Sequence, residues 1–344
     1  MSKVPKILYA VQGTGNGHVA RASEIIPILQ KYGEVDVVLS GDQSEVNLPV
    51  KPKYRSKGIV FIYNSKGGIS YIKTLFKNNL VRIFREIFTF PVYDYDIVIN
   101  DFESITAWAC KLKGKDCFGL GHQASFQSKK CPHPEERDWL GAFILKYYAP
   151  CSSYLGFHFD RYDKFIYSPV IRSDIRAIVP SNKRHYTVYL PAFGNNEIEL
   201  ILNKVENVKW EVFSKHTSAV SSKGNITFYP ISSAGFIKSF SECEGVFTSA
   251  GFETPAEALY LGKKLMLVPI KGQYEQLCNA EGAKKMGVPV IYELNQKSIP
   301  ILQDWILNTK PIKVDYPDTT EFLIHSFIIG PWHKDLKEIE PVNN

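Results

Sequence analysis

The chain has 344 residues, 44% of them hydrophobic and 22% charged, with a formal net charge of +6. This length exceeds the usual size of one hydrophobic core, so we expect two domains of an ordinary globular protein. The longest apolar stretches are strand-sized, which argues against a membrane-spanning helix, and the N-terminal apolar run is too short for a signal peptide. The six cysteines lack paired spacing, which predicts reduced thiols in the cytoplasm. The basic residues are dispersed, so we expect no nucleic-acid partner.

Strand-like and helix-like segments alternate through the first half of the chain. The expected strands are 6–12, 35–39, 58–63, 96–100 and 116–120, and the expected helices are 18–31, 69–89 and 103–113. This alternation predicts a parallel sheet with helices on both faces.

The alternation breaks at about 160–184, a charged segment with prolines, and then restarts. The later expected strands are 186–190, 209–213, 226–229, 245–248 and 264–268. We therefore expect an α/β fold with two Rossmann-like domains, over residues 1–165 and 184–317. Residues 318–344 form a C-terminal helix and tail that the sequence assigns to neither domain. A cleft between the carboxyl ends of the two sheets is the expected ligand site.

The segment "GTGNGHVARASE", residues 13–24, is a glycine-rich turn between an expected strand and an expected helix. A dinucleotide fingerprint needs G-x-G-x-x-G, but Gly17 is followed directly by His18, which disfavours a nicotinamide cofactor. Two interpretations of His18 remain. It is either a solvated residue in a tight turn or a general base that faces the cleft.

The segment "FTSAGFETPAEALYLGKKLMLVP", residues 247–269, contains a small-residue turn and a helix start. Thr254 as N-cap and Glu257 at the third helical position would form a capping box. The same helix N-terminus offers free N–H groups and a positive dipole, which suit a diphosphate. The next loop, "PIKGQYEQLCNA" at 269–280, is either a hydroxyl-binding site or a solvated helix start.

These motifs together resemble those of the GT-B glycosyltransferases. "TSAGFETPAEAL" followed by "YEQLCNA" is similar to the donor-binding signature of the UDP-sugar-dependent transferases and the MurG-type N-acetylglucosaminyltransferases. "GTGNGHVARA" resembles the first glycine loop of that fold. The resemblance implies an acceptor-binding N-terminal domain, a donor-binding C-terminal domain and hexosyl transfer without a metal.

The resemblance also implies roles for individual residues. His18 is the base and Asp101, after "YDIVIN", orients it. The residues implied to bind the donor are Gly15, Gly17, Gly194, Ser249, Gly251, Thr254, Glu257, Glu275, Gln276 and Asn279. Within this set, the turn at Gly251 and Thr254 holds the diphosphate, Glu257 the ribose, and Glu275 with Gln276 the sugar.

Two positions depart from the small-molecule transferases, which commonly have His where this chain has Ser249 and Asn where it has Glu253. The Ser249 hydroxyl still offers phosphate a hydrogen bond. A carboxylate at position 253 would repel a diphosphate, so we expect Glu253 to point away from it.

Three further features have two interpretations each. His122 either lines the acceptor side of the cleft or is structural. Asp94 and Asp96 spell a DxD metal motif, but Asp96 opens a buried strand, which disfavours metal binding. The segment 68–90 has helical spacing and a net charge of +3; we expect it to face the core, and the alternative is contact with an anionic membrane.

The sequence therefore predicts an inverting glycosyltransferase that moves a sugar from a nucleotide donor, UDP-linked, to an acceptor hydroxyl without a cofactor. The alternatives are a nucleotide-sugar 2-epimerase of the same fold and a non-catalytic nucleotide-sugar-binding protein. The acceptor stays open between a lipid-linked molecule and a glycan. The expected location is the cytoplasm, with peripheral contact at the inner membrane face as the alternative.

Overall fold

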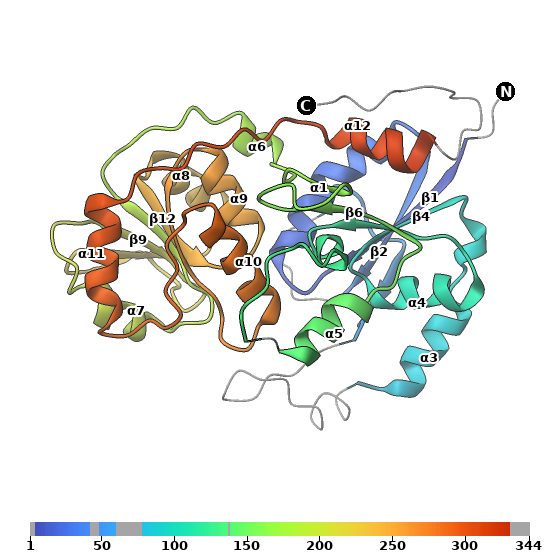
Figure 1. The fold of residues 1–344 in the computed structure, drawn as a ribbon, viewed down its shortest axis with the longest axis horizontal. Helices are drawn as coiled ribbons and strands as arrows, with labels where there is room; N and C mark the ends of the chain where they lie inside the picture. The colour runs from blue at the N-terminus through green and yellow to red at the C-terminus, as the bar shows by residue number, and fades with distance from the viewer. Residues whose placement is uncertain (1–3, 42–47, 60–77, 137, 331–344) are drawn as a thin grey trace.

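The computed structural model describes residues 4–41, 48–59, 78–136 and 138–330, which form two sheets lying side by side along the long axis of the molecule (Figure 1). The first sheet is parallel throughout, in the order β3-β2-β1-β4-β5-β6-β7. Its strands are β1 (Lys6–Gln12), β2 (Glu34–Ser40), β3 (Tyr54–Ser56), β4 (Ile97–Asp101), β5 (Phe118–Gly121), β6 (Ser153–Phe157) and β7 (Ile166–Tyr167). The strand order reverses between β1 and β4, which is where this kind of sheet binds ligands.

Alternating side chains of β1 explain why helices cover both faces of this sheet. Ile7, Tyr9 and Val11 belong to one apolar cluster, and Leu8 and Ala10 belong to another. The covering helices are α1 (Asn16–Gln30), α3 (Leu80–Thr89), α4 (Ser104–Lys113) and α5 (Trp139–Tyr147).

The second sheet has the order β10-β11-β9-β8-β12-β13, and only β10 is antiparallel to its neighbour. Its strands are β8 (Tyr186–Tyr189), β9 (Trp210–Phe213), β10 (Ser221–Lys223), β11 (Ile226–Tyr229), β12 (Gly245–Ser249) and β13 (Lys264–Val268). Its helices are α7 (Asn195–Leu202), α8 (Ser233–Glu242), α9 (Glu253–Tyr260), α10 (Tyr274–Lys285) and α11 (Ser298–Asn308). Helices α9 and α10 face the first half of the chain (Figure 1).

The chain crosses between the two halves twice. The first crossing contains the short helix α6 (Ser173–Arg176), and the second leads from α11 back to α12 (Thr320–Ile324), which continues as a π-helical turn over His325–Ile329 (Figure 1). Glu321 accepts hydrogen bonds from Lys31 Nζ (2.6 Å) and Tyr32 Oη (3.2 Å) at the end of α1. The described part of the segment that the sequence left unassigned, residues 318–330, therefore packs on the first half.

Several elements differ from the sequence expectations. The third strand lies at β3 instead of 58–63, where residues 58 and 59 are irregular and 60–63 lie outside the described residues. The short edge strands β7 and β10 have too few residues for a period-two pattern to be visible.

The helix expected at 69–89 is described from Leu80, where Asn79 caps it by accepting from the Arg82 N–H (2.9 Å); residues 69–77 lie outside the described residues. Only Ile83 and Ile87 of α3 are buried, whereas Val81, Phe84 and Phe88 are 79%, 56% and 60% exposed. Only the narrow stripe formed by Ile83 and Ile87 therefore faces the core as expected. Among all the helices within the described ranges, none is long and apolar enough to span a bilayer.

Candidate active site

The start of α1 places His18 at the carboxyl edge of the first sheet. The preceding turn requires glycine at two positions for different reasons. Gly15 has φ = 115°, which disfavours any side chain, and a Cβ on Gly13 would lie 2.9 Å from Leu39 Cδ1. The chain can thus leave β1 and enter α1 within three residues, and His18 lies in the first helical turn.

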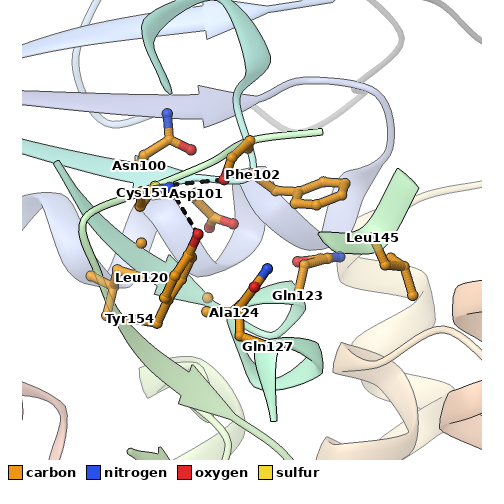
Figure 2. A pocket seen from close by; sticks show the side chains of 13 residues that line it. Asn100, Asp101, Phe102, Leu120, Gln123, Ala124, Gln127, Leu145, Cys151 and Tyr154 are labelled. Atoms are coloured by element: carbon orange, nitrogen blue, oxygen red, sulfur yellow. Dashed lines mark hydrogen bonds between the residues drawn. The ribbon is translucent and has the colours of Figure 1, made fainter. Parts of the chain in front are cut away.

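Asp101 ends β4, next to β1, in a tightly held turn. Asn100 Oδ1 accepts from the Glu103 N–H and Asn100 Nδ2 donates to the Glu103 carbonyl, both at 2.8 Å. These two hydrogen bonds close the turn around Phe102, which has φ = 55°. Figure 2 shows Asp101 and Phe102 beside a cavity of about 10 Å³, which is room for about one water.

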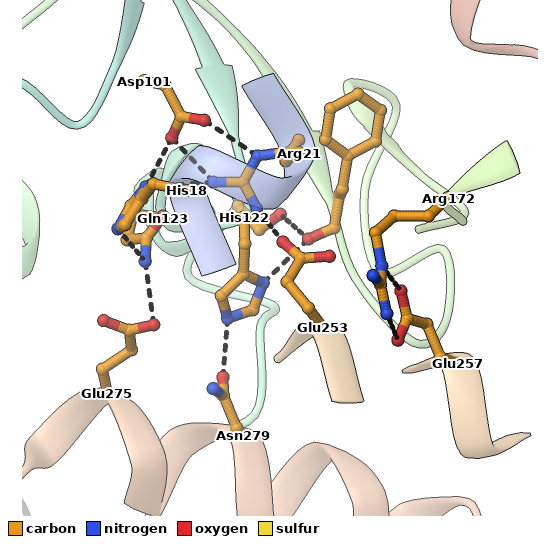
Figure 3. Close-up of polar contacts among 12 residues, drawn as sticks. His18, Arg21, Asp101, His122, Gln123, Arg172, Glu253, Glu257, Glu275 and Asn279 are labelled. Atoms are coloured by element: carbon orange, nitrogen blue, oxygen red, sulfur yellow. Dashed lines mark hydrogen bonds and ion pairs between the residues drawn. The ribbon is translucent and has the colours of Figure 1, made fainter. Parts of the chain in front are cut away.

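His18, Asp101 and Arg21 form a compact polar cluster (Figure 3). His18 Nδ1 lies 2.8 Å from Asp101 Oδ1, and Arg21 donates to Asp101 from Nε (2.9 Å) and Nη2 (2.7 Å). Asp101 has no exposed surface. Burial by itself would raise its pKa, but Arg21 and His18 outweigh this effect and lower the pKa to about 2. Asp101 is therefore ionised at neutral pH and can orient the imidazole.

The other ring nitrogen of His18 faces the second half of the chain. Gln123 Nε2 lies 3.4 Å from His18 Nε2 and donates to Glu275 Oε1 of α10 at 2.8 Å. A proton on Nδ1, hydrogen-bonded to Asp101, leaves Nε2 as the acceptor that a general base needs. The His18 side chain is 13% exposed and lies at the boundary between the two halves.

The expected capping box at Thr254 is wrong. Helix α9 begins at Glu253, its N-cap is Phe252, and no side chain caps it. Pro255 is accommodated in the first turn because its missing N–H would have no helical partner there. The Glu257 carboxylate, one turn further on, makes no capping bond and instead contacts Arg172. The N-terminus of α9 therefore keeps backbone N–H groups free of side-chain caps, beside the turn at Ser249 and Gly251.

Arg172 holds Glu257 through two parallel hydrogen bonds, from Nε (2.6 Å) and Nη2 (3.0 Å) (Figure 3). Burial raises the pKa of Glu257, while Arg172 opposes the shift. Both residues line a cavity of about 260 Å³ between the two halves. The other lining residues are Asn16, Gly17, Ala20, Tyr189, Phe213, Ile231, Ser232, Ser233, Phe236, Ile237, Glu253 and Thr254.

Glu253 lines this cavity, but its carboxylate has a partner: it is ion-paired with Arg21 of α1 (Figure 3). A Cβ on Gly17 would lie 3.2 Å from Glu253 Cγ, so glycine at position 17 permits the close approach of the two helices. Burial raises the pKa of Glu253 to about 7, with Arg21 opposing the shift.

Two other residues that the resemblance implied as donor ligands make hydrogen-bond contacts within the protein. Gln276 Oε1 accepts from the Ile270 N–H (2.9 Å), and Asn279 contacts His122 Nε2 (2.6 Å). His122 is fully buried, which lowers its pKa to about 3, so its structural interpretation is the one that fits. Gly194 caps α7, and the described lining of the cavity does not include it.

The two aspartates of the DxD motif lie away from this site. Asp94 ends a short 3-10 helix, and Asp96 accepts from the Lys6 N–H (2.9 Å) at the opening end of β1. Asp101 lies at the other end of these strands. Over the described ranges, no group of three or more His, Cys, Asp or Glu residues is arranged to hold a metal ion.

The sequence patterns did not indicate Arg21, Gln123 and Arg172 as parts of this site. Arg21 had a detectable signal, since it follows His18 by three residues and so shares its helix face. Gln123 begins a short 3-10 helix (Gln123–Gln127) and Arg172 lies in an irregular segment, so no periodicity in the sequence indicates the direction of either side chain.

Comparison with known proteins shows which solved structures have a similar fold. A search of curated proteins finds no match. Similar solved structures include the glycotransferase of kitacinnamycin, with 13% identity, 93% of each chain covered and a TM-score of 0.56. MurG of Acinetobacter baumannii has 13% identity over 95% of this chain and all of its own, with a TM-score of 0.51. Arabidopsis thaliana UGT89C1 complexed with UDP-L-rhamnose has 13% identity, 96% of each chain covered and a TM-score of 0.56.

These likenesses confirm the predicted GT-B fold of two Rossmann-like domains facing across a cleft. The model of the family described as glycosyl transferase family 1 matches residues 5–309. The chain therefore belongs to glycosyl transferase family 1.

Proposed function

We propose that this glycosyltransferase is an inverting enzyme that moves a sugar from a UDP-sugar to an acceptor hydroxyl. The observation that carries the proposal is the contact of His18 Nδ1 with the buried, ionised Asp101, which leaves Nε2 at the boundary of the two halves. The uncapped N-terminus of α9 belongs to the facing half. A base and an anion site thus face each other across one cleft.

The proposed reaction is a single displacement. His18 Nε2 takes the proton of the acceptor hydroxyl as its oxygen bonds to the anomeric carbon of the sugar. The bond from that carbon to the diphosphate oxygen breaks on the opposite face, and its electron pair leaves with UDP. Asp101 stabilises the imidazolium that forms, and the N–H groups at the start of α9 stabilise the diphosphate charge.

The donor is proposed to occupy the cavity of about 260 Å³. Tyr189, Phe213 and Phe236 supply aromatic surface for a nucleobase, and Glu257 accepts from the ribose hydroxyls beside Arg172. UDP is supported by the solved structure of UGT89C1, which holds UDP-L-rhamnose. Because the start of α9 takes the diphosphate charge, the reaction as proposed requires neither a divalent cation nor a cofactor.

The reaction is proposed to take place in the cytoplasm, which the six free cysteines support. We also propose that α3 rests on an anionic lipid surface. Its exposed apolar residues, Val81, Phe84 and Phe88, lie beside the exposed cation Arg85. Such contact would suit a lipid-linked acceptor.

A UDP-sugar screen in the presence of EDTA tests the proposal. A transferase releases UDP only when an acceptor is added, an epimerase produces a new UDP-sugar, and a binding protein shows affinity without turnover. Recovery of turnover only with Mg²⁺ or Mn²⁺ would contradict the metal-free mechanism.

His18→Ala is expected to lower kcat by roughly 10²–10⁴-fold and to leave UDP affinity nearly unchanged, because the base acts on the acceptor and not on the nucleotide. The matched control is His216→Ala, at an exposed position of the second half. Wild-type kcat in the His18 variant would remove the assignment of the base.

A further inference from the structure

Arg21 connects the candidate base to the opposite half of the molecule. Its guanidinium holds Asp101 of β4 through Nε and Nη2, and its remaining nitrogen, Nη1, is ion-paired with Glu253 of α9. Arg21 and Glu253 are 232 positions apart in the sequence. The side chains of Arg21, Asp101 and Glu253 are 2%, 0% and 14% exposed, so water contributes little to these contacts.

The burial of these charges makes their mutual geometry strict. A buried charge without a partner is costly, and a planar guanidinium satisfies its partners only along its own fixed directions. The plane of Arg21 therefore sets the orientation of the Asp101 carboxylate, which in turn faces His18 Nδ1. Glu253 fixes that plane from the second half of the chain.

We propose that Arg21 and Glu253 are positioning residues that give the His18–Asp101 pair its working geometry only while α9 is apposed to α1. The proposal rests on the proposed function and extends it, because it makes the orientation of Asp101 and His18 depend on how closely the two halves approach each other. Neither residue acts on the reacting atoms. Their effect reaches the imidazole through Asp101 and through Arg21 Nη2, which lies 3.1 Å from His18 Nδ1.

The position of Glu253 predicts opposite effects on binding and on turnover. Glu253 lies in the first turn of α9 and lines the donor cavity, so its negative charge opposes the binding of a diphosphate there. Glu253→Gln removes that charge and also weakens the hold on Arg21. We expect the affinity for UDP to rise about 2–5-fold while kcat falls roughly 10–100-fold, because small displacements of a catalytic group are costly. A residue needed only for folding would lower both.

The experiment uses Arg21→Lys, Glu253→Gln and the double variant of the full chain at pH 8, where Glu253 is ionised. Lysine keeps the buried charge, but its single ammonium cannot contact Asp101 on two sides and Glu253 together. UDP affinity is measured by calorimetry, and kcat by UDP release with the donor and acceptor that the screen identifies. The matched control is Glu321→Gln, which breaks the exposed ion pair of α1 with α12.

The expected result is non-additivity: the second substitution costs less kcat in the double variant than it does alone. Additive losses, or wild-type kcat in Glu253→Gln, would overturn the proposal, as would a parallel fall in UDP affinity and kcat.

A readout independent of turnover separates this proposal from the proposed function. ¹⁵N NMR of histidine-labelled protein reports the tautomer of His18, whose signals are identified by their loss in His18→Ala. We expect a smaller Nδ1–H fraction in Glu253→Gln than in the wild type or Glu321→Gln. If Glu253→Gln changes the tautomer of His18 but the wild type transfers no sugar, the proposed function fails alone. If Glu253→Gln leaves the tautomer unchanged and the wild type transfers sugar, the positioning role alone is refuted.

Discussion

At the scale of single residues, Glu257 has two candidate partners, the ribose of the donor and Arg172. If it binds the ribose, its carboxylate accepts charge-assisted hydrogen bonds from the 2′- and 3′-hydroxyls, each worth about 1.5–3 kcal/mol. Glu257→Gln is then expected to weaken UDP binding tenfold or more, measured by calorimetry. The wild type would also discriminate against 2′,3′-dideoxy-UDP.

The control for this prediction is Arg172→Lys, which leaves the Glu257 carboxylate in place and is expected to keep the discrimination against the dideoxy nucleotide. The bidentate contact in the structure adds one consequence that the sequence did not predict. Both variants disturb an ion pair whose Glu257 side chain is only 3% exposed, so both are expected to lower the melting temperature. Equal UDP affinity in wild type and Glu257→Gln would leave Glu257 with a purely structural role.

The low pKa of Asp101 makes the free energy of unfolding depend on pH. In the folded state burial opposes ionisation, but Arg21 and His18 lower the pKa from 3.8 to about 2. The unfolded chain therefore binds more protons between these values, so the contribution of Asp101 is complete above about pH 5 and is lost as pH falls toward 2. This contribution is about 2 kcal/mol. Urea unfolding should show the difference between wild type and Asp101→Asn shrinking over that range; a constant difference would contradict it.

The pairing of His18 with Asp101 was predicted from the resemblance to the GT-B transferases. The structure brings the two side chains within 2.8 Å because β1 and β4 are neighbouring parallel strands, whose carboxyl ends share one edge of the sheet. The sequence did not predict the partner of Glu253. The expectation was only that this carboxylate points away from a diphosphate, whereas its contact with Arg21 depends on how closely α1 and α9 approach. Such contacts follow from the packing of two domains, which no local pattern encodes.

At the scale of elements, the types of the long segments were predictable and their ends were not. The start of α9 shows why: Thr254, Pro255 and Glu257 fit a capping box in sequence, yet the helix begins two residues earlier and Glu257 contacts Arg172. Tertiary partners thus decided between two helix starts of similar local preference.

The exposed face of α3 leads to a prediction about lipid binding. Phe84 and Phe88 are more than half exposed, so replacing both with serine removes apolar surface without opening the core. We expect the Phe84→Ser, Phe88→Ser variant to lose most sedimentation with phosphatidylglycerol vesicles, with an unchanged melting temperature. Phosphatidylcholine vesicles test the role of charge. The matched control is Tyr93→Ser, an exposed aromatic outside α3. Equal sedimentation of variant and wild type would exclude α3 as the lipid contact.

At the scale of the whole molecule, the two sheets share one apolar cluster. That cluster joins Ile7 and Ile25 of the first half to Val246 and Leu259 of the second. It also contains Ile324 of α12, which has no exposed surface and reaches the first half by the second crossing of the chain. Because the cluster is continuous, we expect the halves to unfold together and not as separate domains.

Ile324→Ala tests this cooperativity, since it removes buried methyl groups from the part of the cluster where α12 packs on α1. The expected loss in the free energy of unfolding is about 2–5 kcal/mol. Hydrogen exchange of β9 (Trp210–Phe213) reports the second half, and hydrogen exchange of β1 (Lys6–Gln12) reports the first. Both readouts are expected to shift to lower urea by the same amount, whereas Phe322→Ala, at a 41% exposed position of α12, should shift neither by much. A shift confined to residues 6–12 would mean that the halves unfold independently, and then the contact between Arg21 and Glu253 could open without loss of either fold.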